Sequence, residues 1–317
     1  MATTDESLSG RQGVERATGL AVGPQDRLIR RMYRDRWGYY FILPNVLLVV
    51  VFTLIPIIWS CLLSFQEYMP MGSKWIGLGN YVNVCQDLIF WRSMKNTIYY
   101  TVGVVPLGLA LCMLLAVLIF PLRKGWQIFF KASLYLPGVT SGAVLALIWV
   151  WLFNPAFGLL NYLLSLVGLG PVMWLADART AMPSIMLMSI VSGLGSTVIL
   201  YLAALGGIPS TLYEAADIDG ADAWVKFFRI TLPLLKPTTL YALVMNTVYS
   251  FQVFTQIYMM TRGEPFYATS TVVYRIYETA FERLQFGLAS AQAMILFVVI
   301  VAMAYLQFKY LSTDVEY

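Results

Sequence analysis

The sequence predicts an all-α, polytopic membrane protein with about six transmembrane helices. Of its 317 residues, 59% are hydrophobic and only 12% are charged, and its mean hydropathy is +0.70. Soluble domains carry about 25% charged residues, so this composition indicates that lipid is the surrounding solvent. Six stretches of roughly 20 or more residues contain no Asp, Glu, Lys or Arg, and each is long enough to cross about 30 Å of hydrocarbon.

The six predicted spans follow one another with polar connections between them. They cover residues 39–65, 97–120, 132–153, 181–204, 238–261 and 286–308. Tyr and Trp favour the membrane interface because they combine an apolar ring with a polar tip. The aromatic residues that mark span ends are Trp37, Tyr39, Tyr40, Tyr99, Tyr100, Trp149, Trp151 and Tyr310. A long polar arm precedes the first span, so we expect this span to stay in the mature chain rather than to act as a cleaved signal.

Lys and Arg residues concentrate on one side of the predicted membrane. The N-terminal arm (1–38), the loop 121–131, the loop 205–237 and the residues after the last span (309–317) carry 14 of the 21, and the three alternate loops carry 7. The positive-inside rule therefore predicts that both termini are cytoplasmic, with a membrane domain at 39–311 and a short tail at 312–317. We interpret the arginines of the arm as a stop signal beside anionic lipid, with a partner-binding role as the alternative. They include Arg27, Arg30, Arg31, Arg34 and Arg36.

Missing residue types exclude several function classes. The chain has no histidine, and Cys61, Cys85 and Cys112 have no C-x-x-C spacing, so we expect no zinc, copper or haem site. No phosphate-binding loop and no catalytic triad can be assembled, which argues against an enzyme. The spans hold no ionisable carboxylate or basic group for proton coupling. Sodium coupling through carbonyl and hydroxyl oxygens stays open.

The loop at 206–237 has the order of a helix, a glycine hinge and a second helix. Thr211 and Glu214 form a capping-box pattern that predicts a helix start near Leu212. Gly220 is suited to end that helix in a left-handed conformation. We expect a second helix to start at Ala221 and to be confined by prolines 233 and 237. The loop has four acidic and three basic residues, so its acidic first helix suits a groove on a soluble partner better than anionic lipid.

The residues of this loop resemble a known motif. Glu214-Ala215-Ala216, Gly220 four positions later and Ile230-Thr231-Leu232-Pro233 are similar to the EAA loop of binding-protein-dependent ABC importer permeases. The resemblance implies a cytoplasmic coupling helix seated in a cleft of an ATPase subunit. The implied ATPase-coupling residues are Glu214, Ala215, Ala216, Asp219, Gly220 and Pro233. For Glu214 alone, a role as a helix cap is the alternative.

Further segments resemble the carbohydrate-type permeases, and specifically the six-helix member of the permease pair. They are residues 75–81, Phe90-Trp91, Asn96-Thr97, 158–162, 251–254 and 287–291. Together with the EAA-type loop they extend over roughly residues 38–311. The long polar arm departs from the family pattern.

Polar residues on spans four and five predict a solute pathway. Buried polar groups in lipid cost several kcal/mol unless they are satisfied or face a cavity. The candidates by helical spacing are Ser189, Gly193 and Ser196 on span four, and Asn246, Tyr249 and Ser250 on span five. Ser192 and Gln256 lie on the same spans. The alternative is that these side chains only bond across helices.

The resemblance implies a permease subunit of an ATP-driven sugar importer in the cytoplasmic membrane of a bacterium or archaeon. Its expected partners are a second permease, an ATPase dimer that binds ATP and Mg, and an external solute-binding protein; this chain itself is expected to need no cofactor. The external loop 262–285 is either a docking site for the binding protein or a solvated loop. The alternatives to the importer are a sodium-coupled carrier and a membrane scaffold that moves no solute.

Overall fold

The structure is a computed structural model that describes residues 36–69 and 72–311. The predicted tail at 312–317 and most of the arm at 1–38 lie outside the described residues. The chain divides after Trp59 into two units, which we describe separately.

The described part of the first unit is a long apolar helix. It consists of α3 (Arg36–Val49), a π-helical turn η1 (Val50–Leu54) and the start of α4 (Ile55–Leu63). In the π turn, the Ile55 N–H bonds to the Val50 carbonyl, one residue further back than in an α-helix. The next residue, Pro56, has no N–H and would clash with the carbonyl four residues back, so a wider turn suits this position. Side chains from Gly38 to Trp59 are exposed, as a lipid- or protein-facing span requires.

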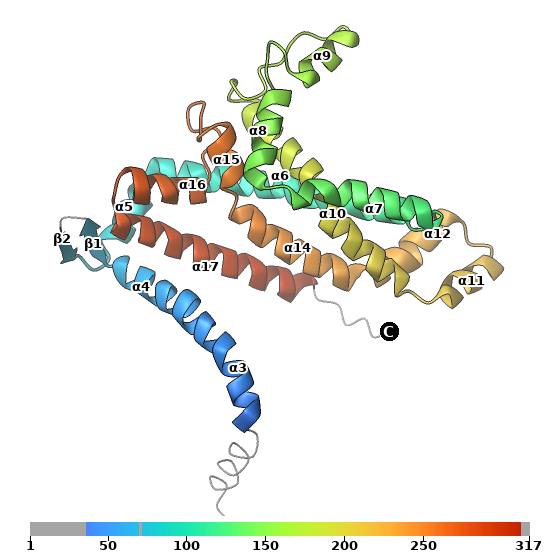
Figure 1. The fold of residues 1–317 in the computed structure, drawn as a ribbon, viewed down its shortest axis with the longest axis horizontal. Helices are drawn as coiled ribbons and strands as arrows, with labels where there is room; N and C mark the ends of the chain where they lie inside the picture. Colours follow the sequence, from blue (N-terminus) through green and yellow to red (C-terminus); the bar gives the residue numbers. More distant parts are fainter. Residues whose placement is uncertain (1–35, 70–71, 312–317) are drawn as a thin grey trace, which may run out of the picture. The chain divides into compact units, whose positions relative to one another are not determined.

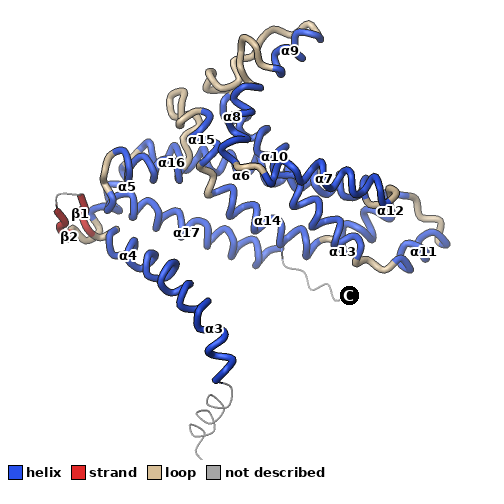
Figure 2. Tube along the Cα trace, viewed as in Figure 1, coloured by secondary structure: helices blue, strands red, loops and turns tan. Residues whose placement is uncertain are grey.

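The second unit begins with the end of α4 and a β-hairpin and continues as a bundle of helices (Figure 1). Strands β1 (Gln66–Met69) and β2 (Gly72–Trp75) pair antiparallel, with Gln66 opposite Trp75. The all-α prediction missed this short hairpin, which is the sheet seen in Figure 2.

The helices after it are α5 (Gly79–Gln86), α6 (Leu88–Ile119), α7 (Lys124–Val139), α8 (Gly142–Leu152), α9 (Leu159–Leu166), α10 (Ala181–Gly206), α11 (Ser210–Ile218), α12 (Ala223–Lys226), η2 (Phe227–Thr231), α13 (Leu232–Leu234), α14 (Lys236–Phe251), α15 (Thr255–Met260), α16 (Val272–Tyr277), η3 (Glu278–Glu282) and α17 (Phe286–Leu311).

The all-α membrane fold is confirmed, whereas the count of six spans is not. Among the described residues, four helices are long and apolar enough to cross a membrane: Gly38–Leu63, α6, α10 and α17. The count rises to five if α7 and α8, which meet at an angle of 99°, form one bent span. The predicted spans 181–204 and 286–308 agree closely with α10 and α17.

Two predicted spans are broken in the structure. The predicted span 132–153 bends between α7 and α8, directly after Pro137 and Gly138 in the last turn of α7. Proline and glycine both weaken a helix at this point. The predicted span 238–261 is interrupted at residues 252–254, between α14 and α15. At 16 residues, α14 is about 24 Å long and does not cross the hydrocarbon by itself.

Helix α10 is central to the packing of the second unit. On one side it buries Val198, Tyr201 and Leu202 against Cys112 and Ala116 of α6. On another side, Gly195 lets the backbone of α7 approach so closely that an added Cβ would lie 2.5 Å from the Leu134 carbonyl oxygen. Gly195 therefore serves close helix packing, as small residues do between membrane helices. The Cβ position of Gly193 is open.

Candidate functional site

A polar cavity of about 450 Å³ lies among the helices of the second unit. Its walls come from α6, α7, α8, α10, α14 and α15. The volume lies in the range of 300–1,000 Å³ that is usual for small-molecule sites. Polar side chains in its wall come from Tyr100, Thr140, Ser189, Ser192, Asn246, Tyr249, Ser250, Gln252, Thr255 and Gln256.

The polar groups of the cavity differ in how they are satisfied. The Tyr100 hydroxyl donates to the Ser189 hydroxyl at 2.7 Å, which joins α6 to α10. The Asn246 amide donates to the Ala242 carbonyl at 2.8 Å, so its carbonyl oxygen is left for another partner. The buried hydroxyl of Ser250 has no hydrogen-bond partner in the described part of the chain. Tyr249 is 66% exposed. The wall therefore presents hydroxyls, an amide oxygen and an aromatic face to the cavity.

The structure brings together five of the six predicted pathway residues. Ser189, Gly193, Asn246, Tyr249 and Ser250 all line the cavity. Their functional roles stay predictions, because position alone does not establish transport. Ser196 is the exception: it is exposed and lies outside the cavity wall, and its pathway role also stays a prediction. Seven residues separate it from Ser189, about 10 Å along the axis, which carries it past the end of the cavity.

Several cavity residues were missed from the sequence. Tyr100 was interpreted as an interfacial residue, but it is 3% exposed and bonded to Ser189. The reason is that α6 starts at Leu88, nine residues before the predicted span, so Tyr100 lies about 18 Å into the helix. Thr140 and Gln252 lie at the two helix breaks. The Pro137-Gly138 pair was the sequence signal that could have located the first break.

The loop between α10 and α14 begins with helix α11. Gly220 has a φ of +72°, as predicted for a left-handed helix stop. The Ala221 N–H bonds to the Ala216 carbonyl at 2.9 Å, and the Gly220 N–H bonds to the Asp217 carbonyl at 3.1 Å. These two bonds form a Schellman motif. The predicted capping box is wrong: Pro209 is the N-cap residue and no side chain caps the helix. Thr211 lies inside the first turn, where it cannot act as the N-cap.

The second half of the loop is a nearly continuous helical segment. It starts at Ala223 rather than Ala221, because the Asp222 carboxylate accepts from the Val225 N–H at 2.8 Å and so caps α12. The helix also passes through Pro233, which was predicted to end it. A π-helical turn, η2, precedes Pro233, and in this wider turn the missing N–H of the proline is tolerated. The chain then enters α14 at Lys236.

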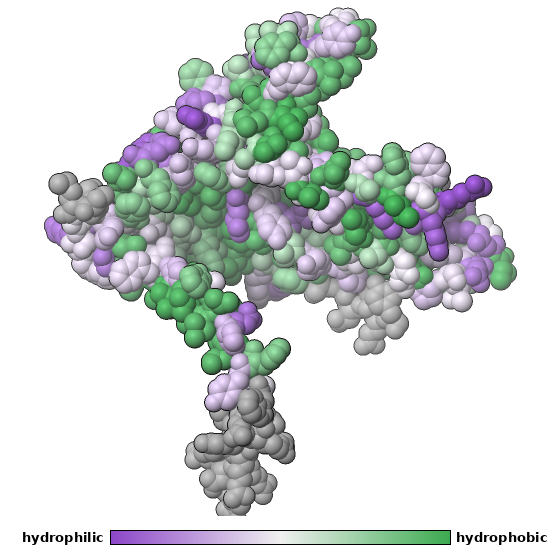
Figure 3. Space-filling model, viewed as in Figure 1, coloured by the Kyte–Doolittle hydropathy of each residue, from purple (hydrophilic) through white to green (hydrophobic). Residues whose placement is uncertain are grey.

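The loop presents an exposed surface that is both acidic and apolar. Glu214, Ala215 and Asp219 are exposed and Ala216 is half-buried. Ile218 is 88% exposed and Trp224 is 71% exposed, while Asp217 forms an ion pair with Lys226. Hydrophilic side chains gather at this end of the second unit (Figure 3). Large exposed apolar side chains beside carboxylates are typical of a protein-docking surface.

The loop is fixed to the bundle from its inner side. The Tyr213 hydroxyl and the Thr231 hydroxyl lie 2.9 Å apart, which joins α11 to η2. Tyr213 also packs against the core cluster that contains Ile208 and Leu235. The inner side of the loop is therefore packed beside the end of α10 and the start of α14.

A buried ion cluster occupies the loop predicted at 262–285. Arg275 is 4% exposed, and its guanidinium donates to Asp87 at 2.9 Å and to Glu278 at 2.7 Å. Glu278 also accepts from Arg283 at 2.6 Å. Burial alone raises the pKa of both carboxyls, but the hydrogen bonds and charge of Arg275 outweigh it and hold each pKa below its ordinary value. Some of the charged residues of this loop thus belong to an internal network.

The comparisons with known proteins agree with the resemblance drawn from the loop. Residues 105–317 match the sequence profile of the binding-protein-dependent transport system inner membrane component. The probable ABC transporter permease protein YesP of Bacillus subtilis is 36% identical over 286 residues, which is 88% of this chain and 92% of YesP. The sn-glycerol-3-phosphate transport system permease protein UgpA of Agrobacterium fabrum is 33% identical, over 88% of this chain and 96% of UgpA.

A solved structure has the same fold. It is a crystal structure of a bacterial alginate ABC transporter in complex with an alginate pentasaccharide-bound periplasmic protein. One of its chains superposes with a TM-score of 0.80 at 27% identity, over 89% of this chain and 96% of that chain. The fold, the profile and the relatives lead to one conclusion: this chain belongs to the family of binding-protein-dependent transport system inner membrane components, the permease subunits of ABC importers.

Proposed function

We propose that the chain forms half of the membrane pathway of an ABC importer for a sugar or sugar derivative. The second half would come from a related permease, energy from an ATPase dimer on the cytoplasmic side, and substrate from an external solute-binding protein. The relatives named for sn-glycerol 3-phosphate and the neighbour named for alginate support polyhydroxylated solutes as the substrate class. ATP and Mg would bind the partner ATPase, and both termini of this chain would be cytoplasmic.

One observation carries the proposal: the two helices that enclose the loop also line the cavity. Helix α10 carries Ser189 and ends at Gly206, four residues before α11. Helix α14 starts at Lys236, directly after the loop, and carries Asn246 and Ser250. The cavity residues lie about 15–26 Å along these helices from the loop. A displacement of the loop would therefore reach both walls of the cavity through rigid elements.

The exposed surface of α11 is the proposed ATPase contact. Glu214 would pair with a basic group in a cleft of the ATPase, while the small side chains of Ala215 and Ala216 permit close approach. Gly220 and its Schellman motif would set the turn that presents the helix. Pro233 would shape the return into α14. Closure of the ATPases would then move this loop and exchange inward- and outward-facing states of the cavity.

This chain's share of the lining carries no counter-ion for a charged substrate. Within the described residues, the cavity wall contains hydroxyls and amides and no Asp, Glu, Lys or Arg. A charged substrate, such as the acidic polysaccharide alginate named for the structural neighbour, would need a counter-ion from the second permease, because a lone charge is costly in a medium of low dielectric constant. The hydroxyl groups of a sugar match a wall that combines hydrogen-bonding groups with an aromatic face.

The proposal is tested with the assembled transporter in proteoliposomes. Glu214→Arg removes a charge-assisted contact worth about 1.5–3 kcal/mol, so affinity for the ATPase should fall roughly 10- to 150-fold. Asp222→Asn is the matched control, because it removes a neighbouring charge but keeps the α12 cap. Asn246→Leu should lower uptake without weakening ATPase binding.

Three results would contradict the proposal. A sodium-coupled carrier would lose uptake when an ionophore dissipates the sodium gradient and would retain it without ATP. A scaffold that moves no solute would show an effect of Asn246→Leu on assembly alone. ATPase binding that is equally strong in Glu214→Arg and in the control would remove the loop from the mechanism.

A further inference from the structure

Six aromatic rings form a continuous row in the second unit. The row starts at the cavity, because Phe254 is part of the cavity wall. It continues through Tyr258 on α15, Tyr277 at the end of α16 and Phe281 on η3. It ends with Phe286 at the start of α17 and Tyr68 on β1.

Neighbouring rings in the row are in contact. Ring centroids are 5.4 Å apart for Phe254 and Tyr258, 5.3 Å for Tyr258 and Tyr277, and 5.3 Å for Tyr277 and Phe281. The last two steps, from Phe281 to Phe286 and from Phe286 to Tyr68, measure 6.2 and 6.1 Å. These separations lie in the range in which aromatic rings attract each other.

The sequence builds the row from two helical pairs. Phe254 and Tyr258 are four residues apart, as are Tyr277 and Phe281, and this spacing places each pair on one helix face. The triangle of Phe254, Tyr258 and Tyr277 joins the two pairs, because the Phe254 and Tyr277 rings are also 5.1 Å apart.

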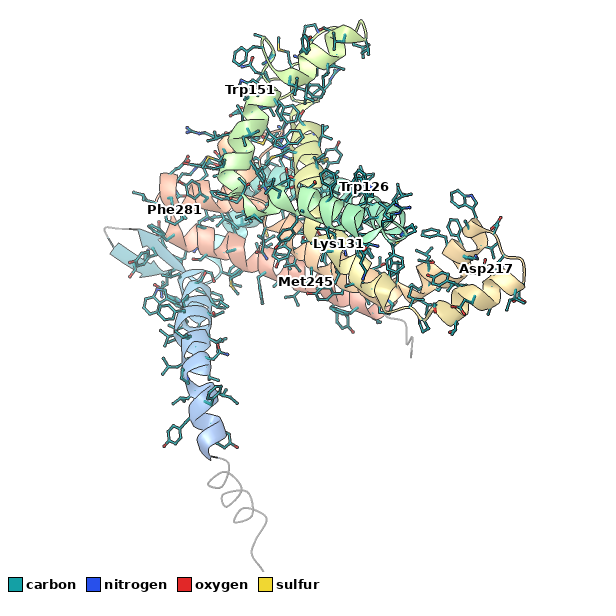
Figure 4. The ribbon with its side chains drawn as sticks, turned by 45° about the vertical axis from the view of Figure 1, so that its right-hand side comes forward. Trp126, Lys131, Trp151, Asp217, Met245 and Phe281 are labelled. Atoms are coloured by element: carbon teal, nitrogen blue, oxygen red, sulfur yellow. The ribbon has the colours of Figure 1, made fainter. Side chains whose placement is uncertain are left out.

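The row is most exposed at Phe281. Phe254, Tyr258 and Tyr277, on the cavity side, and Phe286 are half-buried, whereas Phe281 is 64% exposed. Figure 4 labels Phe281 at the end of the unit opposite to Asp217, which lies on the loop at 206–237. The row therefore leads away from the cytoplasmic end of the unit.

Charged neighbours indicate that the row faces water rather than hydrocarbon. The Arg262 guanidinium lies 5.8 Å from the centroid of the Tyr258 ring. Glu282, next to Phe281, and Glu67, next to Tyr68, are both exposed. Exposed charges of this kind are strongly disfavoured inside the bilayer. Aromatic faces beside polar groups are the surfaces on which the C–H faces of pyranose rings stack.

We propose that this row is an outer binding track for pyranose rings, along which an oligosaccharide passes between the external surface and the cavity. The proposal rests on the proposed function and deepens it, because it specifies a substrate with apolar ring faces. Phe254 is the point where the track meets the cavity.

The test uses the complete transporter in nanodiscs and saturation-transfer difference NMR. The probe is methyl β-D-glucopyranoside, and glycerol serves as a polyol without a ring. Tyr258→Leu and Phe281→Leu keep an apolar side chain but remove the flat aromatic face. We expect affinity for the pyranoside to fall roughly 2- to 10-fold in each variant, with no change for glycerol. Phe308→Leu is the matched control, since Phe308 is 52% exposed on α17 and lies outside the row.

Three results would overturn the proposal. The first is equal saturation of the pyranoside ring protons in the wild type, Phe281→Leu and Phe308→Leu. The second is an equal decrease for glycerol, which would mean a general structural effect. The third is a failure of a hydrophilic maleimide to label Phe281→Cys in the assembled transporter, measured in a Cys61→Ser/Cys85→Ser background. A partner protein would then cover the row. ATP hydrolysis that depends on Glu214 is measured in the same samples, so failure of the track is distinguished from failure of the importer proposal.

Discussion

Replacement of Arg275 by methionine should strongly destabilise the second unit. Arg275 is 4% exposed and bonds to Asp87 at 2.9 Å and to Glu278 at 2.7 Å. Methionine has a similar length and fills the space, so the main loss is electrostatic. Asp87 also caps α6 by accepting from the Ile89 N–H at 2.9 Å. The arginine thus connects the start of α6 to α16.

The magnitude follows from what the substitution leaves behind. Loss of one partner from a buried ion pair typically costs about 3–5 kcal/mol, because the remaining charge is uncompensated. Arg283 still neutralises Glu278 in part, while Asp87 loses its cationic partner in the cluster. We therefore expect the free energy of unfolding to fall by about 3 kcal/mol, which corresponds to a decrease in Tm on the order of 10 °C.

Thermal unfolding can be followed through the thiol of Cys112. This side chain is 3% exposed and becomes accessible to a thiol-reactive fluorophore on unfolding. A Cys61→Ser/Cys85→Ser background removes the two more accessible thiols. Asp87→Asn retains the helix cap and removes only the charge. A double-mutant cycle with Arg275→Met then gives the coupling energy, expected at about 1.5–3 kcal/mol.

The cluster also predicts how stability depends on pH. Asp87 and Glu278 have folded-state pKa values below their unfolded values, so their contribution to the stability of the fold is complete above about pH 4–5. This stabilisation is lost as pH falls through the lowered folded-state pKa values. The Tm difference between the wild type and Arg275→Met should therefore be constant near neutral pH and shrink in acid. A coupling energy under about 0.5 kcal/mol, or a Tm difference that grows in acid, would refute the reasoning.

Two further predictions concern the helix packing. Gly195→Ala should lower the free energy of unfolding by about 1–3 kcal/mol, because the added Cβ would lie 2.5 Å from a backbone oxygen of α7. Gly193→Ala should leave the free energy of unfolding unchanged, since the Cβ position of Gly193 is open. Equal Tm values for the two variants in the same assay would contradict this prediction. Gln292→Leu should leave Tm unchanged or raise it, because Gln292 is 0% exposed and neither polar atom of its side chain has a partner in the described part of the chain. A fall in Tm by several degrees would indicate that the amide has a bonding partner.

Charge and hydropathy were sufficient to predict two of the unbroken helices. Helices α10 and α17 agree with the predicted ranges within a few residues. The stop at Gly220 was also predictable, since a left-handed residue in that position favours glycine. In these cases the local chemistry and the tertiary structure favour the same conformation.

Other features depend on contacts that hydropathy does not describe. Helix α6 starts nine residues before its predicted span, because a charge ends an apolar window but does not end a helix. The error hid Tyr100 from the predicted pathway. The ion cluster joins Asp87 to Arg275 across 188 residues of sequence, and no local pattern indicates such a pairing. The capping box failed because Pro209 moved the helix start by two residues.

The two helix breaks and the cavity are parts of the same feature. The break between α7 and α8 contributes Thr140 to the cavity wall, and the break between α14 and α15 contributes Gln252 and Val253. Irregular backbone at membrane depth is tolerated only where it is buried in protein or lines a water-filled cavity. A hydrated cavity therefore explains why two predicted spans are not continuous helices. Helix α10 is unbroken from the cavity to the loop at 206–237, whereas α14 ends at the cavity. The movement proposed for this loop would thus shift the α10 wall as a rigid body and let the opposite wall bend at residue 252.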